Sequence, residues 1–266
     1  DNDEWVAGGV MLTLASVMLS PMFLFIDFRD LTTEGVWLLA VTLPLEILGY
    51  YLFLSSIRMS ALSLTLPLLS FTPALTIVVA SALLDEKIGS MGLAGVLLVT
   101  IGAYILNIDL RDFSALGPIK AVWSDRGARR MLMVALLWAV TSTLGKSGVI
   151  LFGALQFGYI ITALVGVVFL GVGLFRIRFQ SLPVILDGRI VLTFVLAGVL
   201  MSLQEVTHFL AVSMAPVAYM ISVKRVSMVI GVIFGWRFFG ETNIGNRLTG
   251  ALIMLVGVIL LSCVSD

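Results

Sequence analysis

Nine long apolar stretches constrain the fold more than any other feature of the sequence. A helix of roughly 20 apolar residues crosses the ~30 Å hydrocarbon core of a bilayer. In lipid the backbone must satisfy its own hydrogen bonds, and a helix does so within one segment. We therefore predict an all-α polytopic membrane protein, with spans at about 5–26, 35–57, 61–83, 91–107, 131–152, 157–176, 190–212, 216–239 and 246–263.

The composition agrees with a bilayer environment and argues against several functions. Hydrophobic residues make up 60% of the chain and charged residues 12%, about half the ~25% usual in soluble domains. The formal net charge is zero, so we expect no nucleic-acid partner. Cys263 is the only cysteine, so no disulfide can form within the chain. The sequence has no P-loop, no HExxH motif and no Asp-rich motif in the spans, so we expect neither an enzyme nor a cofactor or metal site.

Positive charges distinguish the two sides of the predicted membrane protein. One face collects eleven basic residues, which are Arg58, Arg111, Lys120, Arg126, Arg129, Arg130, Arg176, Arg178, Arg189, Arg237 and Arg247. The other face has only Arg29 and Lys87. The positive-inside rule therefore predicts that the 108–130 segment is cytoplasmic and that Asp266 lies outside.

The sequence also matches itself at an offset of 155 residues. Residues 47–106, beginning ILGYYLFLSS, lie over residues 202–261, beginning SLQEVTHFLA. The ends of the spans fall in register, and the identical positions include Met59/Met214, Glu86/Glu241, Leu93/Leu248, Gly95/Gly250, Gly102/Gly257 and Leu106/Leu261. We interpret the match as an internal duplication, which is the build of many secondary transporters.

The two copies carry different numbers of spans. The second repeat, 131–263, has five, whereas the first, 1–107, has four, and the polar segment 108–130 with Gly117-Pro118 is the expected linker. We expect the span equivalent to 131–152 to precede Asp1 in a longer protein. A duplicated unit of five spans enters the membrane from opposite sides in its two copies, so the repeats should be inverted.

These features resemble a known family. In each half a short apolar helix ends in Glu86 or Glu241, and a span with Gly95/Gly102 or Gly250/Gly257 follows. Each half is thereby similar to an EamA repeat of the drug/metabolite transporter superfamily, and the resemblance, over about 5–263, rests on doubled pattern and layout. It implies a ten-helix bundle of two inverted five-helix repeats, with a central cavity lined by the first four helices of each repeat. The fifth helices, 91–107 and 246–263, would lie at the periphery. Ten-helix members are usually drawn with both termini in the cytoplasm, so the orientation stays open.

Six ionisable residues lie inside the predicted spans, namely Glu46, Lys146, Glu205, His208, Lys224 and Arg225. A charge at the bilayer centre costs about 2.5–3.5 kcal/mol on insertion scales. Lys224 lies about 12 Å along the helix from Pro216, which is too deep for easy snorkelling. We therefore expect these groups to face a wet cavity or one another.

Two interpretations of the Lys224-Arg225 pair stand. The pair could form an internal ion pair with Glu205 or Glu46, or it could bind an anionic group of a substrate. We favour the second, because the spans carry three bases and two acids. The Lys224-Arg225 pair also resembles one in the sugar-phosphate translocator branch of the superfamily, whose ninth helix carries a Lys-Arg pair that holds the substrate phosphate. Residues 223–226, VKRV, fall in the ninth helix once the missing helix is counted.

The remaining charged residues have candidate roles and simpler alternatives. Lys146 is a further candidate for the anion on charge alone. Glu46, Glu205 and His208 are candidates for charge balance or proton coupling, and Glu205 and His208 share one helix face at i and i+3. For His208 we favour an ordinary hydrogen-bonded interior histidine. Pro44 beside Glu46 frees a backbone carbonyl that could line a site, and an ordinary packing kink is as plausible.

Glycine spacing and two glutamates at helix ends are interpreted structurally. The Gly231/Gly235 GxxxG motif and the spacings of the two glycine pairs above are typical of close helix packing, and they also allow a homodimer contact. For Glu86 and Glu241, at helix ends on loops, we favour local helix capping or an interface charge.

Together these features predict a secondary transporter that moves a small polar, anionic metabolite by alternating access. The expected partners are the small-molecule substrate and the lipid bilayer, and the expected location is the bacterial inner (plasma) membrane, as an integral multi-pass protein. One alternative is an exporter of amphipathic drug-like or amino-acid substrates, with the intramembrane charges structurally paired. Another is a scaffold that transports nothing.

Overall fold

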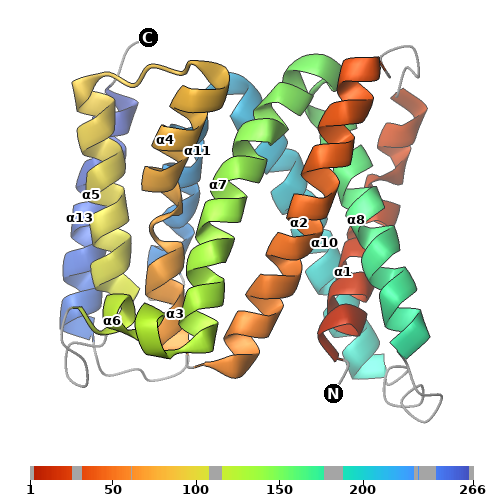
Figure 1. The fold of residues 1–266 in the computed structure, drawn as a ribbon, viewed down its shortest axis with the longest axis horizontal. Helices are drawn as coiled ribbons and strands as arrows, with labels where there is room; N and C mark the ends of the chain where they lie inside the picture. Colours follow the sequence, from red (N-terminus) through yellow and green to blue (C-terminus); the bar gives the residue numbers. More distant parts are fainter. Residues whose placement is uncertain are drawn as a thin grey trace. The chain divides into compact units, whose positions relative to one another are not determined.

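The structure, a computed structural model, describes residues 3–25, 32–60, 62–107, 116–176, 188–230, 233 and 244–263. Its elements are helical throughout this described part, which confirms the predicted all-α class (Figure 1). The elements are α1 (Asp3–Leu19), η1 (Ser20–Phe25), α2 (Thr33–Met59), α3 (Leu62–Leu69), α4 (Thr72–Leu84), α5 (Ser90–Asn107), α6 (Gly117–Ser124), α7 (Arg126–Phe152), α8 (Ala154–Arg176), α10 (Gly188–Met214), α11 (Val217–Arg225) and α13 (Ile244–Ser262).

Five of the described helical segments are long and apolar enough to cross a membrane. They are Thr33–Met59, Thr65–Leu84, Arg126–Phe152, Ala154–Phe175 and Leu192–Met214, and shorter apolar helices cover Gly9–Leu19, Ser90–Leu106 and Leu248–Ser262. Each lies at a predicted span. The ninth predicted span, 216–239, begins with α11, but most of its second half, with Gly231 and Gly235, lies outside the described residues.

The chain forms two compact units, and each combines segments from both predicted repeats. The first unit comprises Asp1–Tyr51 and Leu144–Met214, and the second comprises Leu52–Thr143 and Ala215–Asp266. The long helices α2 and α7 contribute residues to both units.

In the first unit, α1 packs against both α8 and α10. Glycines on the neighbouring helices allow this close packing: a Cβ added at Gly166 of α8 would lie 3.2 Å from the backbone of Leu12, and one at Gly198 of α10 would lie 2.7 Å from Leu14 Cβ. Lipid supplies no hydrophobic drive between helices, so such close van der Waals contact holds them together.

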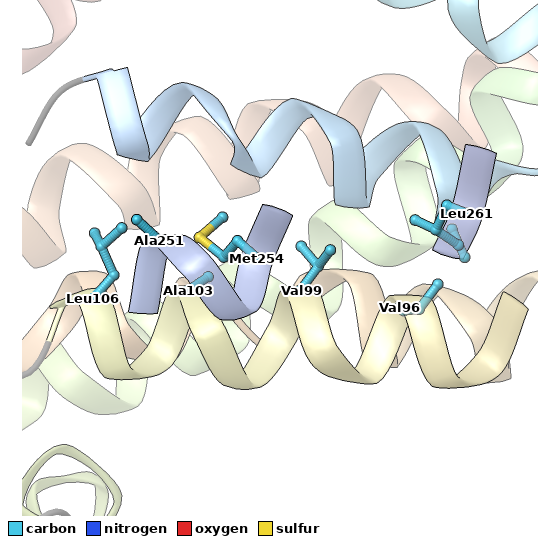
Figure 2. Close-up of a cluster of buried hydrophobic side chains, with 8 residues drawn as sticks. Val96, Val99, Ala103, Leu106, Ala251, Met254 and Leu261 are labelled. Atoms are coloured by element: carbon cyan, nitrogen blue, oxygen red, sulfur yellow. The ribbon is translucent and has the colours of Figure 1, made fainter. Parts of the chain in front are cut away.

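In the second unit, α5 and α13 pack along their length (Figure 2). Their buried side chains include Val96, Val99 and Leu106 of α5 and Met254 and Leu261 of α13. The two backbones touch at the glycines: a Cβ added at Gly102 would lie 2.7 Å from the carbonyl oxygen of Gly250, and one at Gly257 would lie 2.8 Å from that of Gly95. The glycine spacings that predicted close packing are confirmed at these four positions.

The contacts between α5 and α13 are symmetric with respect to the 155-residue repeat offset. Gly95 meets Gly257 and Leu261, whereas Gly102 and Leu106 meet Gly250. The start of α5 therefore faces the end of α13, so the two helices are antiparallel. Each contact also maps onto another one when 155 is added to one residue number and subtracted from the other.

The span predicted at 61–83 is confirmed as one apolar helical segment, and within it a turn at Ser70 and Phe71 separates α3 from α4. Pro73 lies in the first turn of α4, where its missing N–H leaves the carbonyl of Leu69 without the usual helical donor. The hydroxyl of Thr72 donates to that carbonyl at 2.7 Å. A side chain thus satisfies the backbone group that the proline releases.

The predicted linker 108–130 contains more structure than its polar sequence indicated. Helix α6 occupies part of it, and α7 begins at Arg126, earlier than the predicted start at 131. The cause is Asp125, whose Oδ1 accepts hydrogen bonds from the N–H of Ala128 at 2.7 Å and from the Ser60 hydroxyl at 2.6 Å. The carboxylate caps α7 and ties it to the residue that follows α2.

Candidate functional site

Lys224 and Arg225 occupy the last turn of α11, in the second unit. Val226 follows in a turn, and its N–H donates to the carbonyls of Lys224 and Val223. The helix resumes at 227–230. A helix C-terminus carries unsatisfied carbonyls and a partial negative charge, which favours cations. The predicted ninth span is therefore interrupted by a one-residue turn directly after its charged pair.

The break in α11 matches the break between α3 and α4. In α11 the hydroxyl of Ser227 donates to the carbonyl of Lys224 at 2.8 Å. Thr72 and Leu69, which form the corresponding bond, lie 155 positions earlier. Position 228, however, is Met rather than Pro, so no proline in the sequence marked the second break.

Three contacts hold α11 in place within the second unit. The carboxylate of Glu86 accepts a hydrogen bond at 3.1 Å from the N–H of Val217, at the start of the helix. Ala218 is fully buried in the α5/α13 cluster, and the ring of Tyr219 lies against Gly92. Glu86 therefore caps a helix that is remote in sequence rather than a local helix end. Glu241 lies outside the described residues.

The side chain of Arg225 is half-buried, and its Nε is fully buried without a hydrogen-bond partner among the residues that the structure describes. Lys224 is exposed. A buried N–H of a guanidinium that lacks an acceptor is unfavourable, because its desolvation is not offset. An anionic oxygen placed there would satisfy it.

The other four charged candidates belong to the first unit. Glu46 lies on α2, Lys146 on α7, and Glu205 and His208 on α10, and all four are half-buried. The imidazole of His208 meets the ring of Phe209 edge-on, with 4.9 Å between ring centroids.

Glu205 borders a small cavity between α8 and α10. The cavity has a volume of about 10 Å³, and Gly158, Tyr159 and Phe209 also line it, so it approaches the size that holds one water molecule. Gln204 donates to Glu205 Oε1 at 3.3 Å. Phe209 fixes this part of α10, because its ring packs edge-on against Phe157 at 5.5 Å.

Tyr50 is a candidate that the sequence did not reveal. It lies in the electrostatic field of both Glu46 and Glu205, and its ring packs edge-on against Phe169 with 6.2 Å between centroids. Both carboxylates therefore act electrostatically on the same phenol. One sequence feature could have identified Tyr50: it aligns with Glu205 at the 155-residue offset.

No group of three or more His, Cys, Asp and Glu side chains that could hold a metal ion occurs in the described part of the chain. The charged candidates divide between the two units: Lys224 and Arg225 lie in the second, and Glu46, Lys146, Glu205 and His208, all half-buried, lie in the first. Side chains of this kind can bind ions and protons without a bound cofactor.

The apolar helices and these charges within them define an integral, multi-pass α-helical membrane protein. Residues 4–108 match the model of the EamA-like transporter family. The first part of the chain is thus similar to the EamA-like transporter family, which confirms the resemblance there.

The fold of nearly the whole chain also has a match. A protein of known crystal structure is similar with a TM-score of 0.74 over 96% of this chain and 86% of that chain, at 11% sequence identity. This likeness concerns the fold alone. No curated protein matches the sequence.

Proposed function

We propose that the chain is a secondary transporter that moves a small polar, anionic metabolite across the membrane by alternating access. Arg225, with Lys224, binds the anionic group of the substrate. The observation that carries the proposal is the buried Nε of Arg225, which has no acceptor among the described residues and lies at a helix break. Broken helices with exposed backbone ends form the substrate sites of many secondary transporters.

The first-unit residues have the complementary role in this proposal. Glu46, Glu205 and His208 balance charge or carry a coupled proton, and both carboxylates act electrostatically on Tyr50. Lys146 is a further cation for the substrate. Half-buried ionisable groups within spans are typical of proton relays and substrate pathways.

The proposal includes two inverted five-helix repeats and an inner (plasma) membrane location in bacteria. Three observations support the repeats: α2 and α10 each have 27 residues and begin 155 positions apart, both halves break a helix at the same offset, and α5 and α13 exchange contacts in antiparallel register.

The test is ligand-induced thermal stabilisation of the purified chain by phosphate- and carboxylate-bearing metabolites. We expect one class of anion to raise the Tm of the parent, and Arg225→Gln to reduce the apparent affinity by roughly 10–100-fold, as for a lost charge-assisted hydrogen bond of 1.5–3 kcal/mol. Lys87→Gln, an exposed loop cation, is the matched control and should bind like the parent.

Two results would contradict the proposal. One is an anion that stabilises Arg225→Gln as strongly as the parent. The other is a parent that no anion stabilises, together with Lys224→Gln and Arg225→Gln proteins that unfold at much lower temperature. The second result would make the pair structural and would favour the exporter of amphipathic substrates.

A further inference from the structure

A second cavity, far larger than the one beside Glu205, lies wholly in the second unit. Its volume is about 420 Å³, which is within the range of small-molecule sites. It lies where the short helix α6 approaches α3 (Figure 1). Its walls include Leu68, Phe71 and Leu75 near the α3/α4 break and Ile119, Val122 and Trp123 of α6.

The described walls of this cavity are apolar. A polar metabolite would lose its hydration there without gaining hydrogen bonds. The apolar side chains on α6 are spaced at i, i+3 and i+4, so one face of the helix covers the cavity. The cavity therefore suits hydrocarbon and does not belong to the anion site proposed at Arg225.

Cations and a tryptophan border the same helix. Lys120, next to Ile119, is exposed. Arg129 is exposed as well, and its Nη1 donates to the carbonyl of Trp123 at 3.3 Å, which places the guanidinium beside the end of α6. The indole of Trp123 is 84% exposed although it lines the cavity. Tryptophan in such a position is typical of the headgroup zone of a membrane.

We propose that this cavity binds one acyl chain of an anionic phospholipid from the surrounding bilayer, with the lipid phosphate at Lys120 and Arg129. The apolar walls contact the acyl chain, and the two cations bind the negative headgroup. Soluble phosphate lacks the acyl chain and therefore binds with lower affinity. Basic residues at the membrane surface attract anionic lipids in this way. The site is independent of the transported substrate.

Native mass spectrometry of the full chain in detergent, with added phosphatidylglycerol or phosphatidylcholine of identical acyl chains, tests the proposal. We expect the parent to retain phosphatidylglycerol in preference to phosphatidylcholine. The Lys120→Gln/Arg129→Gln protein should lose about tenfold or more in affinity for phosphatidylglycerol and keep that for phosphatidylcholine. Ala74→Trp, which fills the cavity, should weaken binding of both lipids.

Two matched controls separate this site from general effects. Ala82→Trp makes the same exchange at an exposed position two turns further along α4, and Lys87→Gln removes an exposed cation elsewhere; both should bind lipid like the parent. Glycerol 3-phosphate and inorganic phosphate should not displace the lipid.

Three results would overturn the lipid site. They are equal retention of the two lipids by the parent, unchanged lipid binding in an Ala74→Trp protein of normal helicity, and displacement by glycerol 3-phosphate. The last would indicate a phosphate site without a role for the acyl chain.

Discussion

Asp125 shows how one carboxylate can organise a junction between helices. Its Oδ1 accepts from Ser60 and from the N–H of Ala128. The Ser60 hydroxyl, followed by the backbone N–H of Ala128, holds the pKa of Asp125 below its ordinary value. The buried hydroxyl of Ser56 donates to the carbonyl of Gly127 at 2.7 Å in the same junction. The start of α7 is therefore fixed by hydrogen bonds at a position where the sequence is polar.

The capping role of Asp125 predicts a pH-dependent stability. Asp125→Ala should lower the free energy of unfolding by about 1–2 kcal/mol at neutral pH. The carboxylate has a lowered pKa in the folded chain, so its contribution is complete above the ordinary value near 3.9 and is lost as the pH falls through the lower folded value. Thermal unfolding from pH 6 down to about pH 3 should show the parent and Asp125→Asn converging. A constant difference across that range would contradict this role.

Charged residues of the candidate site were easier to predict from the sequence than neutral ones. Lys224 and Arg225 could be singled out because a charge within a span is costly wherever it points. Tyr50 carried no such signal, since its importance depends on which carboxylates the fold brings near it. The Nε of Arg225 is buried without an acceptor among the described residues, and no residue pattern in the sequence indicated this.

At the scale of elements, glycine sets how closely α5 and α13 approach. Each of these glycines would place a Cβ within about 3 Å of the backbone or a packed side chain of the other helix. This contact was predictable, because paired small residues are a sequence signature of close helix packing. The turns after Leu69 and Arg225 were harder to predict. Pro73 marks only the first, and the second is visible only in the hydrogen bonds.

We expect Gly102→Ala to destabilise the protein by about 1–3 kcal/mol, because the added methyl group meets backbone atoms of α13 that cannot rotate away. Gly171 provides the comparison, since a Cβ there has no neighbour within 4 Å. Gly171→Ala should be neutral or stabilise by about 0.5–1 kcal/mol through helix propensity. Thermal unfolding of both variants in detergent measures the contrast, and equal Tm changes would rule out a close contact at Gly102.

At the scale of the whole molecule, the fold class and the membrane environment followed from hydropathy alone. The composition of the two compact units did not, because each unit joins segments that are far apart in the sequence. Which side of the membrane each end faces rests on the distribution of basic residues, and the antiparallel packing of α5 and α13 adds that these two helices end on opposite sides.

Cysteine labelling tests this orientation. Cys263, the single cysteine, is exposed just after α13. A membrane-impermeant maleimide should label Cys263 from outside intact cells, whereas Ser124→Cys, in a Cys263→Ser background, should react only in inside-out vesicles. Labelling of both positions from the same side would contradict the antiparallel arrangement. Labelling of Ser124→Cys from outside and of Cys263 only in inside-out vesicles would contradict the orientation predicted by the positive-inside rule, but not the antiparallel arrangement.

The exchange of contacts between α5 and α13 has a consequence for how such a chain could arise. A surface that packs against an inverted copy of itself is self-complementary, so each half contributes the same glycines and the same apolar side chains to the contact. An ancestral single repeat with this helix face would have been able to pair with a second copy inserted upside down, before gene fusion joined them. The glycines that now bring two helices of one polypeptide together would then descend from a contact between two separate subunits.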